Sequence, residues 1–581
     1  MCGIAGIYSL KIDKKLKIKV LKMGELLTHR GPDESGIFQN NNLILIHKRL
    51  SIIDLKGGQQ PIENKGLILI ANGEIYNDHE IRKKNKDFIF KTKSDCESIL
   101  CLYYKYGVNG FLKLRGMYAF AIYNKKTNEL ILGRDPFGIK PLYFSVSGNN
   151  FIFSSEAQSI IKSDLLKPSI NEIKQKELLQ LQFSTGRESI FKNINRVRPG
   201  EIITIKDSKI TESKIFNKLE KIKKYKISKK RILFKLTESI KLHQRSDVPY
   251  GIFFSGGIDS TLVLYLMSLV NSNPIKTYSV IFPGQNNQKN YLNSICNKFN
   301  SKLKFVEFNE SDFWNLIPVA AKSFDDPVLD YAILPTFKLA QEAKKEIKVV
   351  LTGEGGDELF AGYGRYRSNS RNLIFKKQPF KKGAFKRFSY FNNALSGWDN
   401  SMKNFRTRMI NFNLTELQKV QFLDFEEWLP NDLLIKLDRC LMANSIEGRT
   451  PLVDMELFSE LFGVSDNEKI SNGLGKYYIR KFLNESLPFY NSFTKKSGFT
   501  VPLNLWMPAK YKILSEILPK IRCLKEIFLP QKIKELCLNL RYTSRAIVPV
   551  WRLLFYSLWY LSNFENKKID GNAIDVLNDN T

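Results

Sequence analysis

A glycine-rich segment at residues 255–260 limits most strongly what this chain can fold into. Its sequence, Ser-Gly-Gly-Ile-Asp-Ser, follows an apolar run at residues 250–254 and opens an amphipathic stretch with Leu262, Val263, Leu266 and Leu269. Glycines let a backbone approach phosphate oxygens closely, and a helix N-terminus adds positive potential. The order strand, loop, helix therefore predicts a phosphate-binding loop, although the Gly-Lys-Ser/Thr ending of a Walker A motif is missing.

Strand-length apolar runs recur around this loop and indicate the kind of sheet that carries it. β-Branched and aromatic residues are concentrated at residues 250–254, 276–282, 303–308 and 347–352, with helix-length segments between them. This alternation is typical of a parallel sheet with crossover helices. From about residue 400 the patterning is mainly helical. The C-terminal part is therefore predicted to be a parallel-sheet α/β domain with added helices.

The first part of the chain has a different pattern, rich in short strands. Helical spacing is confined to places such as residues 20–27 and 96–106. Strands are predicted at residues 43–46, 67–71, 117–123, 129–132, 142–145 and 150–153. The predicted division is an N-terminal domain at residues 1–205, a charged linker at 206–230, the α/β domain at 231–565 and a frayed polar tail at 566–581.

Composition places the chain among folded globular proteins. Hydrophobic residues make up 43% and charged residues 25% of its 581 residues, close to globular averages. The formal charge of +32 is of the kind that can mark nucleic-acid or anionic-membrane binding. However, the Lys-rich stretches at residues 11–22, 218–231 and 376–387 lack the interleaved aromatics that a stacking platform for bases requires. We therefore interpret the surplus as a solvated surface and expect no nucleic-acid partner.

Cysteine usage and the chain ends predict a cytoplasmic protein. Seven cysteines occur without a C-x-x-C pair, as expected of reduced thiols, and no secretory signal precedes Cys2. One apolar run, at residues 546–564, is interrupted by Pro549 and Arg552. An interior Arg costs roughly 2.5 to 3.5 kcal/mol on membrane-insertion scales, so a buried terminal helix is expected and no membrane partner.

Cys2 itself is a candidate nucleophile. A small residue at position 2 allows removal of the initiator methionine, which would make Cys2 the true N-terminus. Its free α-amino group would titrate near about 7.7 to 8.0 and could accept the thiol proton during attack. A thiol in this position needs no separate histidine.

Other segments of the first domain accompany Cys2 in a recognisable set. They lie at residues 29–36 (HRGPDESG), 49–54 (RLSIID), 72–77 (NGEIYN), 94–97 (SDCE) and 133–143 (GRDPFGIKPLY). Residues 29–36 are expected to form a tight loop, and Arg49 is an isolated cation after a strand. Together with Cys2-Gly3-Ile4 these segments resemble the class II glutamine amidotransferases. The resemblance implies an N-terminal nucleophile (Ntn) hydrolase domain, an αββα sandwich.

The same resemblance implies roles for individual residues. Cys2 would attack the glutamine amide, while Asn72 and the backbone N–H of Gly73 would hold the oxyanion. Arg49 would grip the α-carboxylate, and Asp95 with Glu74 would orient the α-amino end. The implied glutamine-binding residues are Arg49, Leu50, Ser51, Ile52, Ile53, Asn72, Gly73, Glu74 and Asp95.

The glycine-rich loop resembles the S-G-G-x-D-S loop of N-type ATP pyrophosphatases, which cleave ATP between the α and β phosphates. Segments at residues 351–363, 436–439, 447–454 and 496–502 resemble the asparagine synthetase version of that fold. By this resemblance Asp259 and Asp357 would bind Mg²⁺, Glu354 would assist adenylate formation and take a proton from ammonia, and Lys496 would balance phosphate charge. The implied ATP-binding residues are Phe254, Ser255, Gly256, Gly257, Asp259, Ser260, Val280, Thr352, Gly353 and Asp357.

Three positions depart from the family pattern. Thr352 stands where Ser is usual, and Ala361 where Gly is frequent. The segment Asp325-Asp326-Pro327 replaces an acidic residue, Glu and Pro, and is expected near the acceptor pocket. The third departure leaves the identity of the amidated acid open.

The two sets in this order imply one coupled reaction. Glutamine, ATP and a carboxylic acid, most simply aspartate, would give glutamate, AMP, pyrophosphate and an amide, with an apolar tunnel carrying ammonia between the sites. An enzyme that amidates another acid, such as a uronic acid of a surface polysaccharide, is the alternative. An RNA-modifying adenylating enzyme is a third reading, which would not need Cys2, Arg49, Asn72 and Asp95 together. The expected partners are these small molecules, and the expected assembly is a homodimer.

Overall fold

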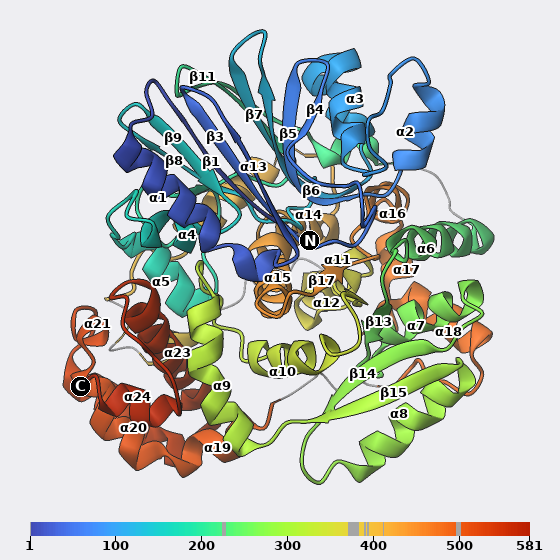
Figure 1. Ribbon diagram of the computed structural model, residues 1–581. Helices are drawn as coiled ribbons and strands as arrows, with labels where there is room; N and C mark the ends of the chain where they lie inside the picture. The colour runs from blue at the N-terminus through green and yellow to red at the C-terminus, as the bar shows by residue number, and fades with distance from the viewer. Residues whose placement is uncertain are drawn as a thin grey trace.

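Two six-stranded antiparallel sheets form the N-terminal part of the computed structural model (Figure 1). The structure describes residues 2–222, 228–369, 383–388, 391, 394–410, 412–494 and 501–581. The first sheet has the order β10(Asn195–Arg196), β8(Tyr143–Ser147), β9(Asn150–Ser154), β1(Gly3–Ser9), β3(Leu43–Arg49), β2(Glu34–Gln39). The second has the order β12(Lys209–Ile215), β11(Glu201–Lys206), β7(Glu129–Arg134), β6(Gly116–Asn124), β5(Leu67–Ile75), β4(Ile62–Asn64).

Helices cover the outer faces of both sheets. On the first sheet lie α1(Lys14–Glu25) and α4(Ala157–Lys162), and on the second lie α2(Asp78–Lys84) and α3(Glu97–Tyr106) (Figure 1). Strand β5 is therefore buried on both sides: Ile68 and Ile70 face the other sheet, whereas Leu69 and Ala71 belong to the core under α3. This alternation follows from the period of two in a strand. The predicted αββα sandwich is confirmed.

A five-stranded parallel sheet organises the C-terminal part, as predicted. Its order is β15(Ser301–Glu307), β14(Ile275–Ile281), β13(Tyr250–Phe253), β16(Val349–Leu351), β17(Glu447–Arg449), with every neighbouring pair parallel. From β13 the chain adds strands on one side and then crosses to add β16 on the other. The carboxyl ends of β13 and β16 are thus a topological switch point, where open α/β sheets bind ligands.

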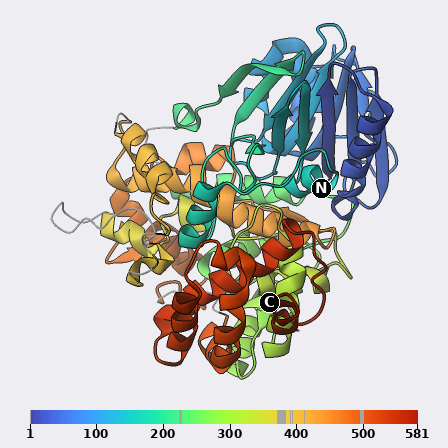
Figure 2. The ribbon, with the colours of Figure 1, turned by 90° about the vertical axis from the view of Figure 1, so that its left-hand side faces the viewer.

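Helices flank this sheet and fill the rest of the C-terminal part (Figures 1 and 2). Around the sheet lie α6(Lys229–His243), α7(Ile258–Val270), α8(Asn286–Lys298), α9(Glu310–Ser323), α10(Ile333–Ala343) and α15(Leu434–Met442). Further helices are α5(Glu172–Leu181), α11(Gly356–Leu359), α12(Gly364–Asn369), α13(Asn400–Met409), α14(Glu416–Leu423), α16(Met455–Leu461), α17(Asp466–Lys469), α18(Tyr477–Ser486), α19(Leu503–Ala509), α20(Tyr511–Ile517), α21(Arg522–Lys525), α22(Pro530–Leu538), α23(Ile547–Asn563) and α24(Ala573–Asn578).

The apolar run near the C-terminus is the buried helix α23, as expected. Arg552 in its middle is 2% exposed and donates to the carbonyl oxygens of Leu179 and Gln180 at 2.7 and 2.6 Å. The C-terminal end of α5 thus accepts both hydrogen bonds from Nη1 of this buried guanidinium, whereas Nε has no partner among the described residues. In the described part of the chain, every helix is too short or too polar to cross a membrane.

Two segments differ from the prediction. The stretch taken as a linker begins with β12, whose seven residues are all exposed although the strand pairs with β11. Because an exposed edge strand carries polar side chains, its composition resembles that of a linker. The tail taken as frayed contains α24, in which Ala573 and Leu577 are fully buried and which packs on α9.

Candidate active site

Cys2 lies at the start of β1, where the two sheets of the first part meet. Its thiol is buried, and its backbone nitrogen donates to Asn72 Oδ1 at 3.0 Å. Burial raises the pKa of the Cys2 thiol, while a hydrogen bond from the backbone of Leu50 opposes that shift. The thiol is therefore held mainly protonated until a base takes its proton.

The side-chain amide of Asn72 accepts a hydrogen bond through Oδ1, while its Nδ2 donor is unused in the described part of the chain. It is fully buried in β5, and its Nδ2 has no hydrogen-bond partner among the described residues. Next to it, Gly73 allows close pairing of β5 with β6, because a Cβ there would lie 2.3 Å from the carbonyl oxygen of Met117. A buried amide donor beside a thiol is suited to an oxyanion.

Two carboxylates lie beyond Asn72. Glu74 and Asp95 are 3% and 4% exposed, and Asp95 Oδ2 accepts from the backbone N–H of Ile75 at 2.5 Å. Burial, and then the charge of Asp95, raises the pKa of Glu74 well above its ordinary value. Burial raises the pKa of Asp95 to about 6. Paired buried carboxylates of this kind fit a cationic ligand such as an α-ammonium group.

Arg49 ends β3 beside Cys2, because the pairing of β1 with β3 places Gly3 opposite Lys48. The prediction of an isolated cation is wrong. The guanidinium pairs with Glu34 Oε2 at 2.7 Å and donates to the carbonyl oxygens of Ile53 and Asp54. Arg49 thus shapes the predicted glutamine loop, since residues 50–54 fold around it. The expected tight loop at residues 29–36 is also shorter than predicted, because β2 begins at residue 34.

The glycine-rich loop connects β13 to α7, as predicted. Gly256 has a φ of +72°, a left-handed conformation that favours glycine, and Gly257 is the N-cap of α7. The hydroxyls of Ser255 and Ser260 lie 3.1 Å apart across the loop. Phe254, directly after β13, and Val280 in β14 are buried.

The second predicted loop follows β16 and interlocks with the first. A Cβ on Gly353 would lie 2.9 Å from Asp259 Cβ and 3.0 Å from the nitrogen of Ser260. The N–H of Thr352 donates to the carbonyl oxygen of Arg449 at 3.0 Å, so the loop is also tied to β17. The switch point therefore brings together predicted ATP-binding residues that are about 100 positions apart in sequence.

Lys476 lies between Asp259 and Asp357, and the sequence analysis missed it. Its ammonium pairs with Asp259 and with Asp357 Oδ1, the latter at 2.6 Å. Burial alone would lower the pKa of Lys476, but these two carboxylates raise it. Lys476 follows Gly473-Leu474-Gly475 and has a φ of +57°, unusual for lysine. The available sequence signal was the short Gly-Leu-Gly-Lys segment directly before a helix.

The same two carboxylates meet a first requirement for Mg²⁺. They share one cation, and Mg²⁺ commonly takes one or two carboxylates with substrate phosphates as its other ligands. Among the described residues there is no group of three or more His, Cys, Asp or Glu side chains that could hold a metal by themselves. An ion held by these two carboxylates would take its other ligands from water or from a bound nucleotide.

The other residues predicted for this site have mixed outcomes. Burial raises the pKa of Glu354, and the positive charge of Lys436 on α15 opposes this shift. Lys496 lies outside the described residues. Ala361, where glycine is frequent, has a φ of +57°, so its backbone keeps the glycine conformation.

The two acids of the segment at residues 325–327 are both buried in ion pairs. Asp325 is fully buried and pairs with Arg439 through both oxygens, at 2.5 and 3.1 Å. Asp326 is 3% exposed and pairs with Arg196 of the first part. Asp325 also accepts from the N–H of Ala157 at 2.6 Å, so both carboxylates contact the first part of the chain. That this segment lies near the acceptor pocket stays a prediction.

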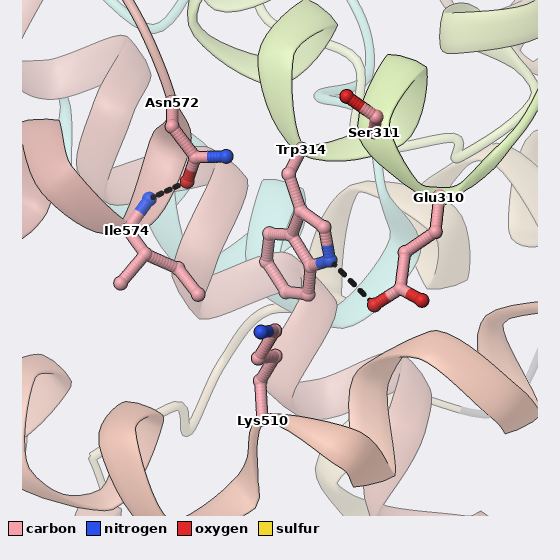
Figure 3. A pocket seen from close by; sticks show the side chains of 6 residues that line it. All are labelled: Glu310, Ser311, Trp314, Lys510, Asn572 and Ile574. Carbon is pink, nitrogen blue, oxygen red and sulfur yellow. Dashed lines mark hydrogen bonds between the residues drawn. The ribbon is translucent and has the colours of Figure 1, made fainter.

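A cavity of about 370 Å³ opens away from these residues, between α9, α20 and α24 (Figure 3). Inside it Trp314 Nε1 donates to Glu310, and Asn572 Oδ1 accepts from the N–H of Ile574. It contains none of the predicted site residues.

Comparisons with known proteins agree with this two-part arrangement. Residues 1–216 match the model of the glutamine amidotransferase domain, and residues 232–560 match that of asparagine synthase. Asparagine synthetase (glutamine-hydrolyzing) 1 of Bacillus subtilis (strain 168) is 30% identical, with 98% of each chain covered. Asparagine synthetase B (glutamine-hydrolyzing) of Escherichia coli (strain K12) is 29% identical over 86% of this chain and 82% of that protein.

The fold and the matched domains define a glutamine amidotransferase joined to an ATP-dependent carbon–nitrogen ligase. The chain belongs to the asparagine synthase family.

Proposed function

We propose that this chain converts aspartate to asparagine, with ammonia released from glutamine at Cys2 and with ATP cleaved to AMP and pyrophosphate. The observation that carries the proposal is that two loops, Ser255–Ser260 and Thr352–Asp357, interlock at the switch point of the α/β sheet. The same chain contains the Cys2–Asn72 pair. The named relatives favour aspartate over a uronic acid as the acceptor.

In the glutaminase half, removal of Met1 frees the α-amine of Cys2 to take the thiol proton. The sulfur attacks the amide carbon of glutamine, and the oxyanion is held by Asn72 Nδ2 and the N–H of Gly73. The amine returns the proton to the departing ammonia, and water then hydrolyses the thioester to glutamate. The free Nδ2 of Asn72 supports this assignment, because its other amide atom is engaged by Cys2.

Charge at both ends of glutamine would be matched by the pocket. Arg49 would hold the α-carboxylate, and Glu74 with Asp95 would hold the α-ammonium group. The remaining predicted members, Leu50, Ser51, Ile52 and Ile53, would line the pocket through their backbone around Arg49.

In the synthetase half, a carboxylate oxygen of aspartate attacks the α-phosphorus of ATP, giving an acyl adenylate and pyrophosphate. Ammonia then displaces AMP. Ser255, Gly256, Gly257 and Ser260 would cradle the phosphates, and Phe254, Val280, Thr352 and Gly353 would contact the adenosine. Asp259 and Asp357 would hold Mg²⁺, which offsets phosphate charge, and Glu354 would take the proton from ammonia. Lys476 would supply the cation that we assigned to Lys496 from the sequence.

Ammonia must pass between the halves, and one apolar cluster extends across both. It joins Leu50 and Met117 of the first part to Leu351 and Val453 of the second. Val453 lies against the second ATP loop, because a Cβ on Gly355 would lie 2.3 Å from it. An apolar route keeps ammonia unprotonated and therefore nucleophilic. We further propose a cytoplasmic location, consistent with seven cysteines that are all free, and a homodimeric assembly.

The test measures pyrophosphate release from ATP and Mg²⁺ with glutamine across aspartate, glutamate, a uronic acid and tRNA. Aspartate is expected to stimulate release and to become asparagine. Cys2→Ala should abolish glutaminase activity while leaving ammonia-dependent synthesis. Release that depends on the uronic acid or on tRNA, and not on aspartate, would overturn the proposed acceptor. Equal loss of both activities in a folded Cys2→Ala protein would contradict the two-site scheme.

A further inference from the structure

Arg449 extends from the ATP-binding part of the chain into the predicted glutamine pocket. It ends β17, the edge strand of the parallel sheet, and its side chain is completely buried. One guanidinium nitrogen, Nη2, lies 3.4 Å from Glu74 Oε2. Nη1 donates to the carbonyl oxygens of His243 and Arg245, and Nε donates to Glu447. The guanidinium is therefore fixed in place from several sides.

Glu74 divides its two oxygens between two environments. Oε2 contacts Arg449, whereas Oε1 is buried with no hydrogen-bond partner among the described residues. A buried carboxylate oxygen without a partner is costly unless a ligand satisfies it. The α-ammonium group of glutamine is the cation that the pocket is expected to receive at Oε1.

The backbone of Arg449 has a second contact, with the ATP loop. Its carbonyl oxygen accepts from the N–H of Thr352 at 3.0 Å, and β17 pairs with β16 immediately before that point. Gly353, the next residue, is packed against Asp259 so closely that a Cβ would lie 2.9 Å from it. Thus Glu74, Arg449, Thr352, Gly353 and Asp259 form a continuous line of contacts between the two pockets.

We propose that Arg449 is a positioning residue that couples glutamine binding to ATP binding, a role that rests on the proposed function. Glutamine adds a cation at Oε1 of Glu74, which favours the ionised carboxylate and strengthens its attraction to Arg449. The pull acts on β17 and, through Thr352, on the loop that packs against Asp259. A ligand shifts an equilibrium only by interacting differently with its two states, and the charge on Glu74 provides this difference.

The coupling is reciprocal, so it can be measured from the glutamine side. Cys2→Ala binds glutamine without consuming it, and its glutamine Kd is measured by calorimetry with and without ATP and Mg²⁺, in the absence of an acceptor acid. We expect ATP to tighten glutamine binding within the usual coupling range of about 5- to 150-fold. In Cys2→Ala/Arg449→Lys the ratio of the two Kd values should fall to about one, because an ammonium cannot keep the several contacts of a guanidinium.

The matched control is Arg115→Lys in the same background. Arg115 also joins the two parts, through Asp454 and Glu238, but has no contact with Glu74. Its ratio should stay at the Cys2→Ala value. The inference is overturned if ATP leaves the glutamine Kd of Cys2→Ala unchanged. It is also overturned if Arg449→Lys keeps the Kd ratio of Cys2→Ala, or if Arg115→Lys lowers that ratio to the same extent as Arg449→Lys.

Two further measurements separate the possible failures. If Arg449→Lys does not fold, Glu74→Gln removes the charge while Arg449 stays, and the ratio should again fall to about one; a preserved ratio would refute the coupling. Glutaminase activity and aspartate-dependent pyrophosphate release are assayed with the unmodified chain. If ATP does not tighten glutamine binding in Cys2→Ala although the unmodified chain has both activities, only the role of Arg449 is rejected. If the unmodified chain lacks both activities, the proposed function is rejected.

Discussion

At the scale of single residues, each proposed pocket brings together polar side chains that are distant in the sequence. Cys2, Asn72, Glu74 and Asp95 come from segments far apart in sequence, and the structure places them at the junction of β1 and β5. Cys2 directly precedes β1, and Asn72 and Glu74 lie within β5, so these motifs were visible next to apolar strand patterns in the sequence. In the proposed ATP pocket the sequence predicts both loops but not Lys476, because its partners Asp259 and Asp357 are brought to it only by folding.

The charge of Asp95 gives a pH-dependent prediction. Burial raises the pKa of Asp95 to about 6, above its ordinary 3.8, so this carboxylate is ionised above about pH 6 and loses its charge as pH falls below it. Glutamine binding to Cys2→Ala should weaken by about tenfold per pH unit below that point, because the α-ammonium group loses a partner. Calorimetry between pH 5 and 8 measures this Kd.

The matching control is Cys2→Ala/Asp95→Asn. Its glutamine Kd should be high throughout and should lack the dependence near pH 6. A flat Kd between pH 5 and 8 in the protein that keeps Asp95 would contradict the assignment.

Replacement of Lys476 tests the cation between the two aspartates. In Lys476→Met the carboxylates of Asp259 and Asp357 lose their shared ammonium, so charge on the phosphates is no longer offset. Ammonia-dependent pyrophosphate release should fall by about 10²- to 10³-fold, the usual effect of removing one group that stabilises charge in a transition state. Glutaminase activity should persist. Lys481→Met, in the exposed part of α18, should leave both rates unchanged, and an active Lys476→Met would remove this lysine from the site.

At the scale of secondary structure, elements with two buried faces or clear alternation were predicted, and polar elements were missed. The strand β5, which is buried on both faces, and the parallel strands β13 and β14 match their apolar runs. The exposed strand β12 reads as a linker, because nothing in its composition distinguishes a hydrogen-bonded edge from a loop. The short strand β17 was also missed, since three residues carry too little periodicity.

Helix α23 gives a prediction about stability. Arg552→Leu keeps the helix apolar but removes the donors to the carbonyl oxygens of Leu179 and Gln180. Leaving a buried acceptor unsatisfied costs about 1 to 3 kcal/mol, so the loss in unfolding free energy should be of that size for each carbonyl. Thermal or denaturant unfolding measures it. The exposed Arg545→Leu is the control and should unfold like the parent; if Arg552→Leu is as stable, these bonds contribute nothing.

At the scale of the whole molecule, buried ion pairs join the two parts. Arg30, fully buried, donates to both oxygens of Asp438 on α15 at 2.8 and 3.0 Å, and its Nε donates to the carbonyl oxygen of Cys2 at 3.2 Å. Figure 2 shows the first part seated on the C-terminal helices. The docking of the two parts and the position of the nucleophile therefore depend on the same arginine.

Asp438→Ala tests this dependence. Removing one member of a buried ion pair costs about 3 to 5 kcal/mol, because it leaves an uncompensated charge. Both the thermal stability and the glutaminase rate should fall, the second because Arg30 no longer holds the backbone of Cys2 firmly. Asp87→Ala, at the exposed pair with Lys105, should change neither. A fall in stability with an unchanged glutaminase rate would separate docking from positioning of Cys2.

By itself, the sequence determined the fold of each part and the chemistry of its main motifs. Strands, turns and the glycine-rich loop depend on burial and steric effects within a few residues, which leave a local pattern. Only the tertiary structure decided which charged groups meet: Lys476 with Asp259 and Asp357, Arg449 with Glu74, and Arg30 with Asp438. Their partners lie more than one hundred positions away in the sequence. A buried ion pair forms only once the two surfaces are in contact, so neither residue alone carries a signal of the other.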